Sequence, residues 1–177
     1  MPTDLDHVLA ELRAGRTAAF RVLVDELAPA LVRLAGRLVG DLQLAEDVVQ
    51  DSLLKAYQAM IDGAFEERAS VRTWLYRIVT NGAIDMRRRR RRVLLEQPID
   101  EASTVTATLA SAEQRLALRE LAAWLDDLPD AQRATLMLSA FEGLSQREIA
   151  EIQNCSEGAV EQRLVRARTA LRAKGRP

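Results

Sequence analysis

Apolar residues recur at helical spacing through most of this chain. In the first quarter the leucines are three or four residues apart, at Leu23, Leu27, Leu31, Leu34 and Leu38. This spacing matches the turn of an α-helix and places them on one face. Glycine and proline are sparse, while Ala, Leu, Arg and Glu dominate, which favours helices over strands. We expect an all-α protein, with helices over residues 5–39, 44–60 and 70–92 and a kink or boundary at Pro29.

The helical periodicity stops between residues 96 and 113. Turn formers dominate this stretch, including Pro98 and a run of Ser and Thr. Pro129 is expected as the first residue of a later helix, where its missing N–H costs nothing. The helices expected beyond the stretch cover about 113–128, 129–143, 145–153 and 157–173. The sequence therefore predicts two small helical domains, residues 1–95 and 114–177, joined by a flexible linker at 96–113.

The net charge of −1 conceals four blocks of alternating sign. Residues 1–67 carry a net −6 and residues 68–92 a net +8, followed by −9 over 93–162 and +6 over 163–177. Basic clusters attract polyanions, so the two basic blocks indicate two places where a polyanion is held. A solvated helix face is the alternative interpretation of either block.

The residue types that most catalytic and metal sites need are scarce. Cys155 is the single cysteine and His7 the single histidine. An intrachain disulfide, a Cys/His zinc site and a His-activated nucleophile are therefore excluded. We expect no catalytic residue, no cofactor and no metal. The acidic N-terminus is unlike a signal peptide, and no apolar run of about 18 residues occurs. We expect a cytoplasmic protein without membrane insertion.

Residues 145–173 have the features of a helix-turn-helix. Ser145 and Glu148 form a capping box that begins one helix. Asn154 suits the left-handed position of a tight turn, and Ser156 is a suitable N-cap for the next helix. An apolar stripe at Val160, Leu164, Ala167 and Leu171 predicts which face of that helix is buried. A helix held in this way can enter the major groove of DNA, although a plain helical hairpin is the alternative.

The C-terminal motifs together resemble a known family. They run Leu128-Pro129, Arg133, Glu142-Gly143-Leu144-Ser145, Glu148-Ile149-Ala150, Ser156-Glu157-Gly158-Ala159-Val160, Arg163-Leu164 and Arg166-Ala167-Arg168. This order and spacing resembles the C-terminal domain of extracytoplasmic-function (ECF) sigma factors, in the sigma-70 superfamily. In that family this domain binds the promoter −35 element.

The N-terminal half resembles the same family independently. Residues 45–57 resemble its polymerase-docking helix, and residues 73–92 resemble the segment that binds and opens the −10 element. The resemblance covers about residues 18–92 and 114–174. It implies a non-enzymatic subunit that directs RNA polymerase to promoter DNA, with an anti-sigma factor as its inhibitor. The implied polymerase contacts are the clamp coiled coil and the flap.

In the docking helix, Leu54 points away from the apolar stripe and is expected to be exposed. Asp47, Gln50 and Asp51 surround it. An apolar side chain ringed by acids suits a basic protein partner, so these four residues are the candidate polymerase contacts. A single exposed leucine is also common on protein surfaces.

The candidates for contact with −10 DNA combine arginines, an amide and aromatic rings. Arginines hold phosphates, an amide can bond to an exposed base edge, and unpaired bases stack on aromatic rings. The candidates are Trp74, Tyr76, Arg77, Asn81, Arg87 and Arg88. A core role is the alternative for both aromatics. The loop at 63–69, which in the family captures a flipped base, carries Glu66 and Glu67 here. Because these acids would repel phosphates, the capture residues are left unassigned.

The candidates for contact with −35 DNA lie on the second helix of the helix-turn-helix. They are Glu161, Gln162, Arg163, Val165, Arg166 and Arg168. Glu161 stands where the family often has a basic residue, and it could accept from a cytosine amino group. Gln153 replaces a usually apolar residue and is expected to weaken local packing.

Two other classes of function are considered. An ordinary helix-turn-helix regulator would bind a duplex operator alone. That interpretation explains residues 129–174 but gives no role to the docking helix at 45–57 or to the arginine-rich segment at 73–92. An enzyme acting on nucleic acid could use Asp47 and Asp51 as metal ligands, yet no third ligand or histidine base accompanies them.

Overall fold

The structure is a computed structural model that describes residues 5–65, 70–96 and 112–175. These residues form eight α-helices and no strand, which confirms the all-α class. The first half contains α1 (Leu5–Arg13), α2 (Ala18–Val39), α3 (Leu42–Ile61) and α4 (Val71–Glu96). The second half contains α5 (Ala112–Asp126), α6 (Asp130–Ala140), α7 (Gln146–Gln153) and α8 (Glu157–Lys174). Among the described helices, none is long and apolar enough to cross a membrane.

Helix α2 provides the buried spine of the first half. Its leucines at the predicted spacing are all buried. Of the kink or boundary expected at Pro29, the boundary was wrong, because α2 continues through this exposed residue. The break lies earlier, where Gly15 adopts a φ of +81° between α1 and α2. A proline on an exposed helix face is tolerated because water can bond to the carbonyl that loses its partner.

Helices α3 and α4 pack against α2 and against each other. They come close together at Gly82 of α4. A Cβ atom there would lie 3.2 Å from Cγ1 of Val48 and 3.4 Å from Oγ of Ser52. The missing side chain therefore lets the two helices approach closely. Asp41 caps the start of α3 by accepting from the Leu44 amide at 3.1 Å.

The second half shows the predicted helix-turn-helix. Ser145 and Glu148 form the complete capping box at the start of α7. Asn154 has a left-handed φ of 48°, and Ser156 caps α8 through the Ala159 amide. One boundary differs from the prediction: Pro129 is the N-cap of α6 and lies outside the helix. Its ψ of 139° is extended, so the helical conformation begins one residue later.

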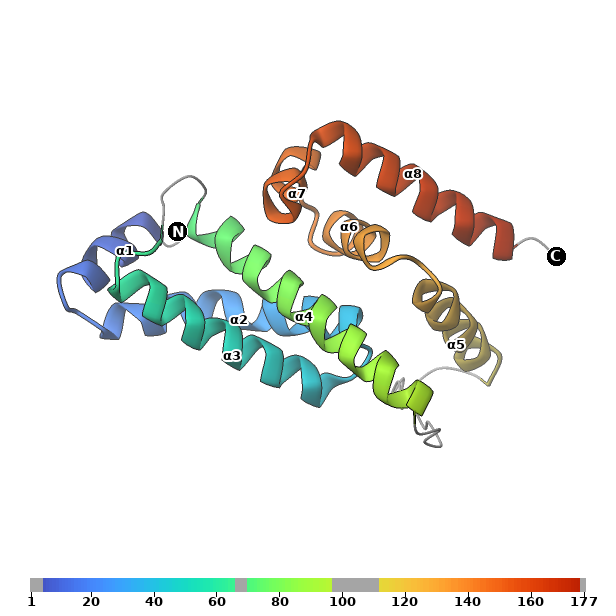
Figure 1. The fold of residues 1–177 in the computed structure, drawn as a ribbon, viewed down its shortest axis with the longest axis horizontal. Coiled ribbons are helices and arrows are strands. Elements are labelled where there is room, and N and C mark those ends of the chain that lie inside the picture. Colours follow the sequence, from blue (N-terminus) through green and yellow to red (C-terminus); the bar gives the residue numbers. More distant parts are fainter. Residues whose placement is uncertain (1–4, 66–69, 97–111, 176–177) are drawn as a thin grey trace.

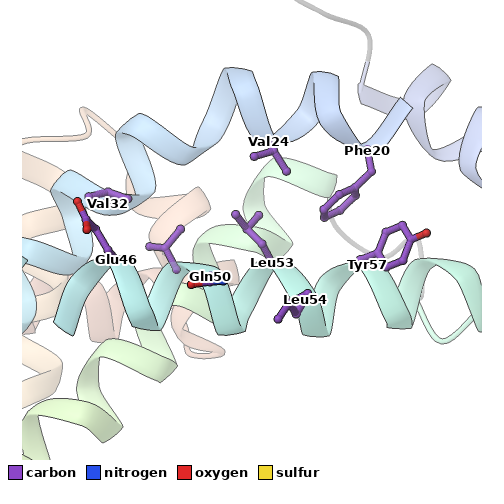
Figure 2. Close-up of a pocket in the computed structure, with 9 residues that line it drawn as sticks. Phe20, Val24, Val32, Glu46, Gln50, Leu53, Leu54 and Tyr57 are labelled. Carbon is purple, nitrogen blue, oxygen red and sulfur yellow. The ribbon is translucent and has the colours of Figure 1, made fainter. Parts of the chain in front are cut away.

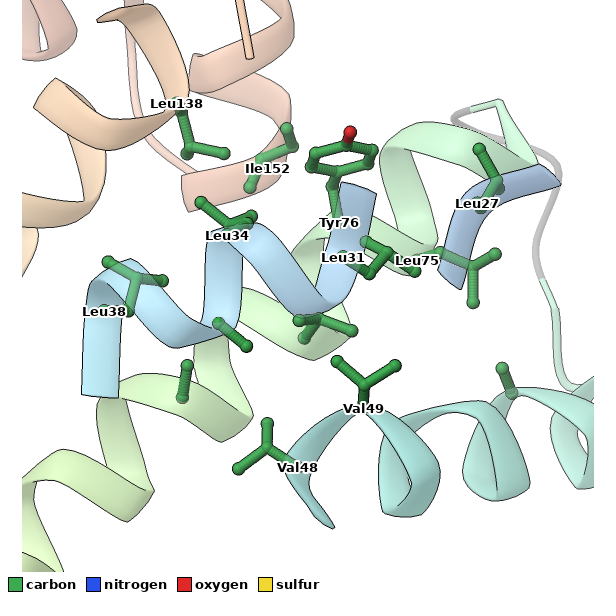
Figure 3. Packing of buried hydrophobic residues seen from close by; sticks show 14 of the residues in the cluster. Leu27, Leu31, Leu34, Leu38, Val48, Val49, Leu75, Tyr76, Leu138 and Ile152 are labelled. Atoms are coloured by element: carbon green, nitrogen blue, oxygen red, sulfur yellow. The ribbon is translucent and has the colours of Figure 1, made fainter. Parts of the chain in front are cut away.

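The two halves pack against each other along α4 (Figure 1). Buried residues of both halves belong to one continuous apolar cluster. Figure 3 shows Tyr76 of α4 beside Leu34 of α2 and Ile152 of α7. The predicted linker falls largely on residues 97–111, which lie outside the described residues.

Candidate polymerase and DNA-binding surfaces

The outer face of α3 presents Leu54 to solvent. This side chain is 58% exposed, and Asp47, Gln50 and Asp51 are also exposed. Helix α3 buries Ala45, Val48, Val49, Ser52, Ala56 and Met60 against its neighbours. The predicted arrangement of an apolar side chain among acids is therefore present. Its role as a docking point stays a prediction.

An apolar groove of about 470 Å³ runs between α2 and α3 beside Leu54. In Figure 2, Phe20 and Val24 project from α2 toward Leu53 and Tyr57 of α3. The rings of Phe20 and Tyr57 meet edge to face at 5.0 Å. The full lining is Phe20, Val24, Val32, Glu46, Val49, Gln50, Leu53, Leu54 and Tyr57.

Sequence reasoning did not identify the α2 wall of this groove. The signal was the spacing of Phe20, Val24 and Val32, which repeats at multiples of four along one stripe. In the sequence this stripe resembles a face that is fully buried in the core. Only the packing of α3 shows that part of the stripe lines a groove.

The two aromatic candidates on α4 have little exposed surface. Trp74 is half-buried against Phe65, with ring centroids 4.7 Å apart. Tyr76 is 1% exposed, and its hydroxyl donates to Glu142 at 3.0 Å. The structure thus places Tyr76 in the core between the halves, where it cannot stack on a base in this conformation. Asn81, in contrast, is exposed on α4.

The predicted phosphate-binding arginines of α4 contact the second half of the chain. Arg77 donates to the Glu151 carbonyl at 2.6 Å. Arg87 is 5% exposed and donates to the Asp126 carbonyl at 2.6 Å. Burial lowers the pKa of the Arg87 guanidinium, although an arginine stays charged. Arg77 and Arg87 are thus engaged with the second half in this structure, and their role as phosphate contacts stays a prediction. Arg88 is exposed but pairs with Asp130 at 2.8 Å.

Helix α8 turns a free polar face to solvent. Its exposed candidates are Glu161, Gln162, Val165, Arg166 and Arg168. The opposite face buries Val160, Leu164 and Ala167, while Leu171 is half-buried. This geometry is that of a recognition helix, because the described residues do not cover the polar face of α8 that would face DNA.

Arg163 is the exception among the α8 candidates. Its Nη1 donates to Gln153 at 2.6 Å and to the Sγ of Cys155 at 3.2 Å. This guanidinium therefore joins α8 to the turn before it and does not extend outward. In this conformation Arg163 is engaged within the helix-turn-helix, and its role as a DNA contact stays a prediction.

Gln153, which was expected to weaken local packing, hydrogen-bonds to residues of two neighbouring helices. Its Oε1 accepts from Arg163 and, at 2.8 Å, from Thr135 of α6. Its Nε2 donates to the Ala131 carbonyl at 3.3 Å. One amide thus connects α6, α7 and α8, which an apolar residue could not do.

The described residues contain no group of three or more His, Cys, Asp and Glu side chains that could hold a metal ion. Asp47 and Asp51 therefore have no third ligand in the part of the chain described.

The chain is similar to known proteins of one family. Residues 23–93 match the family model of sigma-70 region 2, and residues 118–171 match that of sigma-70 region 4. The chain is 33% identical to the RNA polymerase sigma-H factor of Pseudomonas aeruginosa, covering 95% of this chain and 92% of the relative. It is 32% identical to the ECF sigma-E factor of Salmonella typhimurium, with 97% and 95% covered.

Two solved structures are also similar. One is CnrH in complex with the cytosolic domain of CnrY, at a TM-score of 0.70 and 31% identity, with 94% of this chain and 93% of that chain covered. The other is the sigma factor RpoE in complex with the anti-sigma factor NepR from Bartonella quintana. It has a TM-score of 0.67 and 28% identity, covering 88% of this chain and 95% of that one.

The fold and the free face of α8 define a helical transcription protein with a helix-turn-helix. Within that class, the chain belongs to the extracytoplasmic-function sigma factors of the sigma-70 family. It is a transcription initiation factor that directs RNA polymerase to promoters.

Proposed function

We propose that α3 docks this chain on core RNA polymerase through Leu54 and the adjoining groove. The proposal is carried by one observation: a leucine exposed at 58% forms part of an apolar groove and is ringed by acids. Such a surface accepts an apolar side chain from a partner helix, and Asp47 and Asp51 attract its basic residues. The clamp coiled coil is the expected partner, with the flap contacting the second domain.

The first domain, residues 1–95, would then engage the −10 element through α4. Asn81 is exposed and offers both a donor and an acceptor to a base edge. Arg88, and Arg77 and Arg87 once they are released, would neutralise the backbone. Trp74 is half-buried and offers at most one edge to a base.

The second domain, residues 114–177, would read the −35 duplex with α8. Gln162 and Arg166 lie one turn apart on the exposed face. Arginine pairs in a bidentate manner with guanine in the major groove, and Gln pairs with adenine. Glu161, Val165 and Arg168 flank them and complete the surface.

The proposal also covers where the protein acts and what inhibits it. It acts as a non-catalytic subunit in the cytoplasm, where its polymerase and DNA partners are. Both solved relatives named above are complexes, with CnrY in one and the anti-sigma factor NepR in the other. An anti-sigma factor is accordingly the proposed inhibitor of this chain.

Transcription in vitro with core polymerase and a fragmented genome tests the function. We expect discrete start sites that require both the chain and core enzyme. Tight, sequence-specific binding of the free chain to a duplex operator, without any effect of core polymerase, would instead favour the ordinary regulator.

A further inference from the structure

A cavity of about 430 Å³ lies where the C-terminal part of α2 meets the second half of the chain. The first half contributes Val32 and Gly36 of α2 to its lining, and the second half contributes Leu125 of α5 and Met137 of α6. Ligand sites commonly have volumes of about 300–1,000 Å³ and mostly apolar linings with a few polar groups. This cavity has the size and the residue types of a site for a small molecule.

Three arginines line this cavity, and their side chains have different partners. Arg37 donates to Glu142 at 3.2 Å. Arg133 is buried and donates to Asp126 at 2.6 Å and to the Arg37 carbonyl at 2.5 Å. Arg33 is exposed, and no described residue bonds to its side chain or pairs with its charge. The cavity thus has one accessible guanidinium whose charge is uncompensated.

The charge of the buried Arg133 is also incompletely compensated. Burial lowers the pKa of this guanidinium, and the nearby charge of Asp126 only partly offsets the effect. Its buried Nε atom has no hydrogen-bond partner among the described residues. Since an arginine stays charged, its field favours an anion in the cavity. The carboxylate in the lining is that of Asp41, which already accepts from the Leu44 amide at 3.1 Å.

The apolar part of the lining is incompletely covered. Phe141 is 55% exposed and Leu42 is 64% exposed, while Leu125 is half-buried. The guanidinium of Arg37 lies over the Phe141 ring, 4.4 Å from its centroid, so cationic and apolar groups adjoin each other. An apolar body placed here would remove this surface from water, which is favourable.

We propose that this cavity binds a small carboxylate with an apolar body. The carboxylate pairs with Arg33, and the apolar body lies against Val32, Leu125 and Phe141. Only one accessible guanidinium lacks a partner, which matches the single charge of a carboxylate better than the double charge of a phosphate. Because the lining comes from both halves, binding is linked to their packing and stabilises it.

This site is separate from the proposed polymerase and DNA surfaces. Leu54, Asn81 and Arg166 are not part of its lining. The inference therefore goes beyond the proposed function and does not rest on it.

The test is isothermal titration calorimetry of the full chain with decanoate and 2-naphthoate, a linear and a flat carboxylate. Decylamine is the cationic probe of matched length. Arg33→Gln removes the accessible guanidinium, and Arg21→Gln, at an exposed arginine of α2 outside the lining, is its control. Ala122→Phe fills the cavity, and Ala123→Phe, at an exposed neighbour outside the lining, is its control. Circular dichroism checks the folding of each variant.

We expect saturable binding of at least one carboxylate at one site per chain. Decylamine should bind roughly tenfold more weakly, because its ammonium would meet three guanidinium groups. Arg33→Gln should weaken carboxylate binding roughly fivefold, since an exposed ion pair contributes little. Ala122→Phe should weaken it roughly tenfold or more, because the ring occupies the space. Both control variants should bind as the wild type does.

Absence of saturable binding for both carboxylates would overturn the inference. Equal binding of decylamine would overturn it too, since any apolar surface would then suffice. Wild-type affinity in folded Arg33→Gln and Ala122→Phe would locate the site elsewhere, with Arg33→Gln decisive if the phenylalanine variant does not fold. The titration contains neither polymerase nor DNA, so its failure is distinct from a failure of the proposed function.

Discussion

At the scale of single residues, Arg163 and Arg166 on α8 have different environments. Arg163 bonds to Gln153 and Cys155, so its charge stays within the helix-turn-helix. Arg166 is exposed on the surface that faces away from the buried stripe. Arginines three apart on one helix thus have different environments, and their substitutions should have different signatures.

Arg166→Ala should weaken −35 binding by about 1–3 kcal/mol on the preferred sequence and by little on scrambled duplexes, because a bidentate contact to guanine is lost. Arg163→Ala should instead weaken all duplexes alike and lower the melting temperature, since Gln153 loses a partner. Footprinting on matched and scrambled −35 duplexes distinguishes the two. An equal loss from Arg166→Ala on both duplexes would reduce this residue to a phosphate contact.

At the scale of elements, α7 begins at a capping box that contains a titratable carboxylate, that of Glu148. Glu148 closes the capping box of α7 by accepting from both the amide and the hydroxyl of Ser145. The hydrogen bond from the Ser145 side chain is the largest cause that lowers the pKa of Glu148 below its ordinary 4.5. Since the folded pKa is depressed, its contribution to stability is present above about pH 4.5 and is lost as the pH falls through the folded value.

Glu148→Ala should therefore destabilise the chain by roughly 0.3–1.5 kcal/mol at pH 7, toward the low end because solvent screens the group. The difference from wild type should shrink toward zero as the pH falls below the folded pKa. Thermal unfolding of both chains at pH 7 and at a pH below the folded pKa of Glu148 measures this difference in stability. A difference that persists unchanged at low pH would mean that packing, and not the carboxylate, carries the effect.

The docking helix allows a matched comparison of two exposed leucines. Leu54→Ala should weaken core polymerase binding about tenfold, because a buried leucine side chain contributes about 1.5–3 kcal/mol. Leu42→Ala, on the same helix and 64% exposed, lies outside the groove and should bind normally. Holoenzyme assembly by titration measures both variants. Equal affinities for the two would exclude the groove as the docking point.

Most helices were predictable because they carry local signals. The capping box at Ser145, the turn at Asn154 and the leucine stripe of α2 are local signals, and each was confirmed. The helix break at Gly15 and the network around Gln153 were not predicted. The hydrogen bonds of Gln153 depend on residues of α6 and α8 that are distant in sequence. The α2 wall of the groove was missed because an apolar stripe has the same spacing in the sequence whether its neighbours cover it fully or leave part of it exposed.

At the scale of the whole molecule, the alternating charge blocks have two roles. Sequence reasoning assigned the basic block at 68–92 to a polyanion, whereas in the structure several of its arginines meet the acidic second domain. The arginines proposed to contact DNA are thus the ones that contact the second half in this structure. Asn81 is exposed and takes no part in these arginine contacts, so its role can be tested apart from them.

Asn81→Ala should impair promoter opening more than initial promoter engagement. Unstacking a base costs a few kcal/mol, and capture of the base edge by this amide would offset part of that cost. Reactivity of −10 thymines to permanganate, in holoenzyme bound at a promoter, should fall by about tenfold, which corresponds to a loss of roughly 1.4 kcal/mol. Protection of the −35 element in the same complexes should change little, because α8 is untouched. Gln43→Ala, an exposed amide on α3, is the control. Full opening by the Asn81 variant would remove this residue from the mechanism, whereas a matching loss at the −35 element would point to weakened holoenzyme assembly.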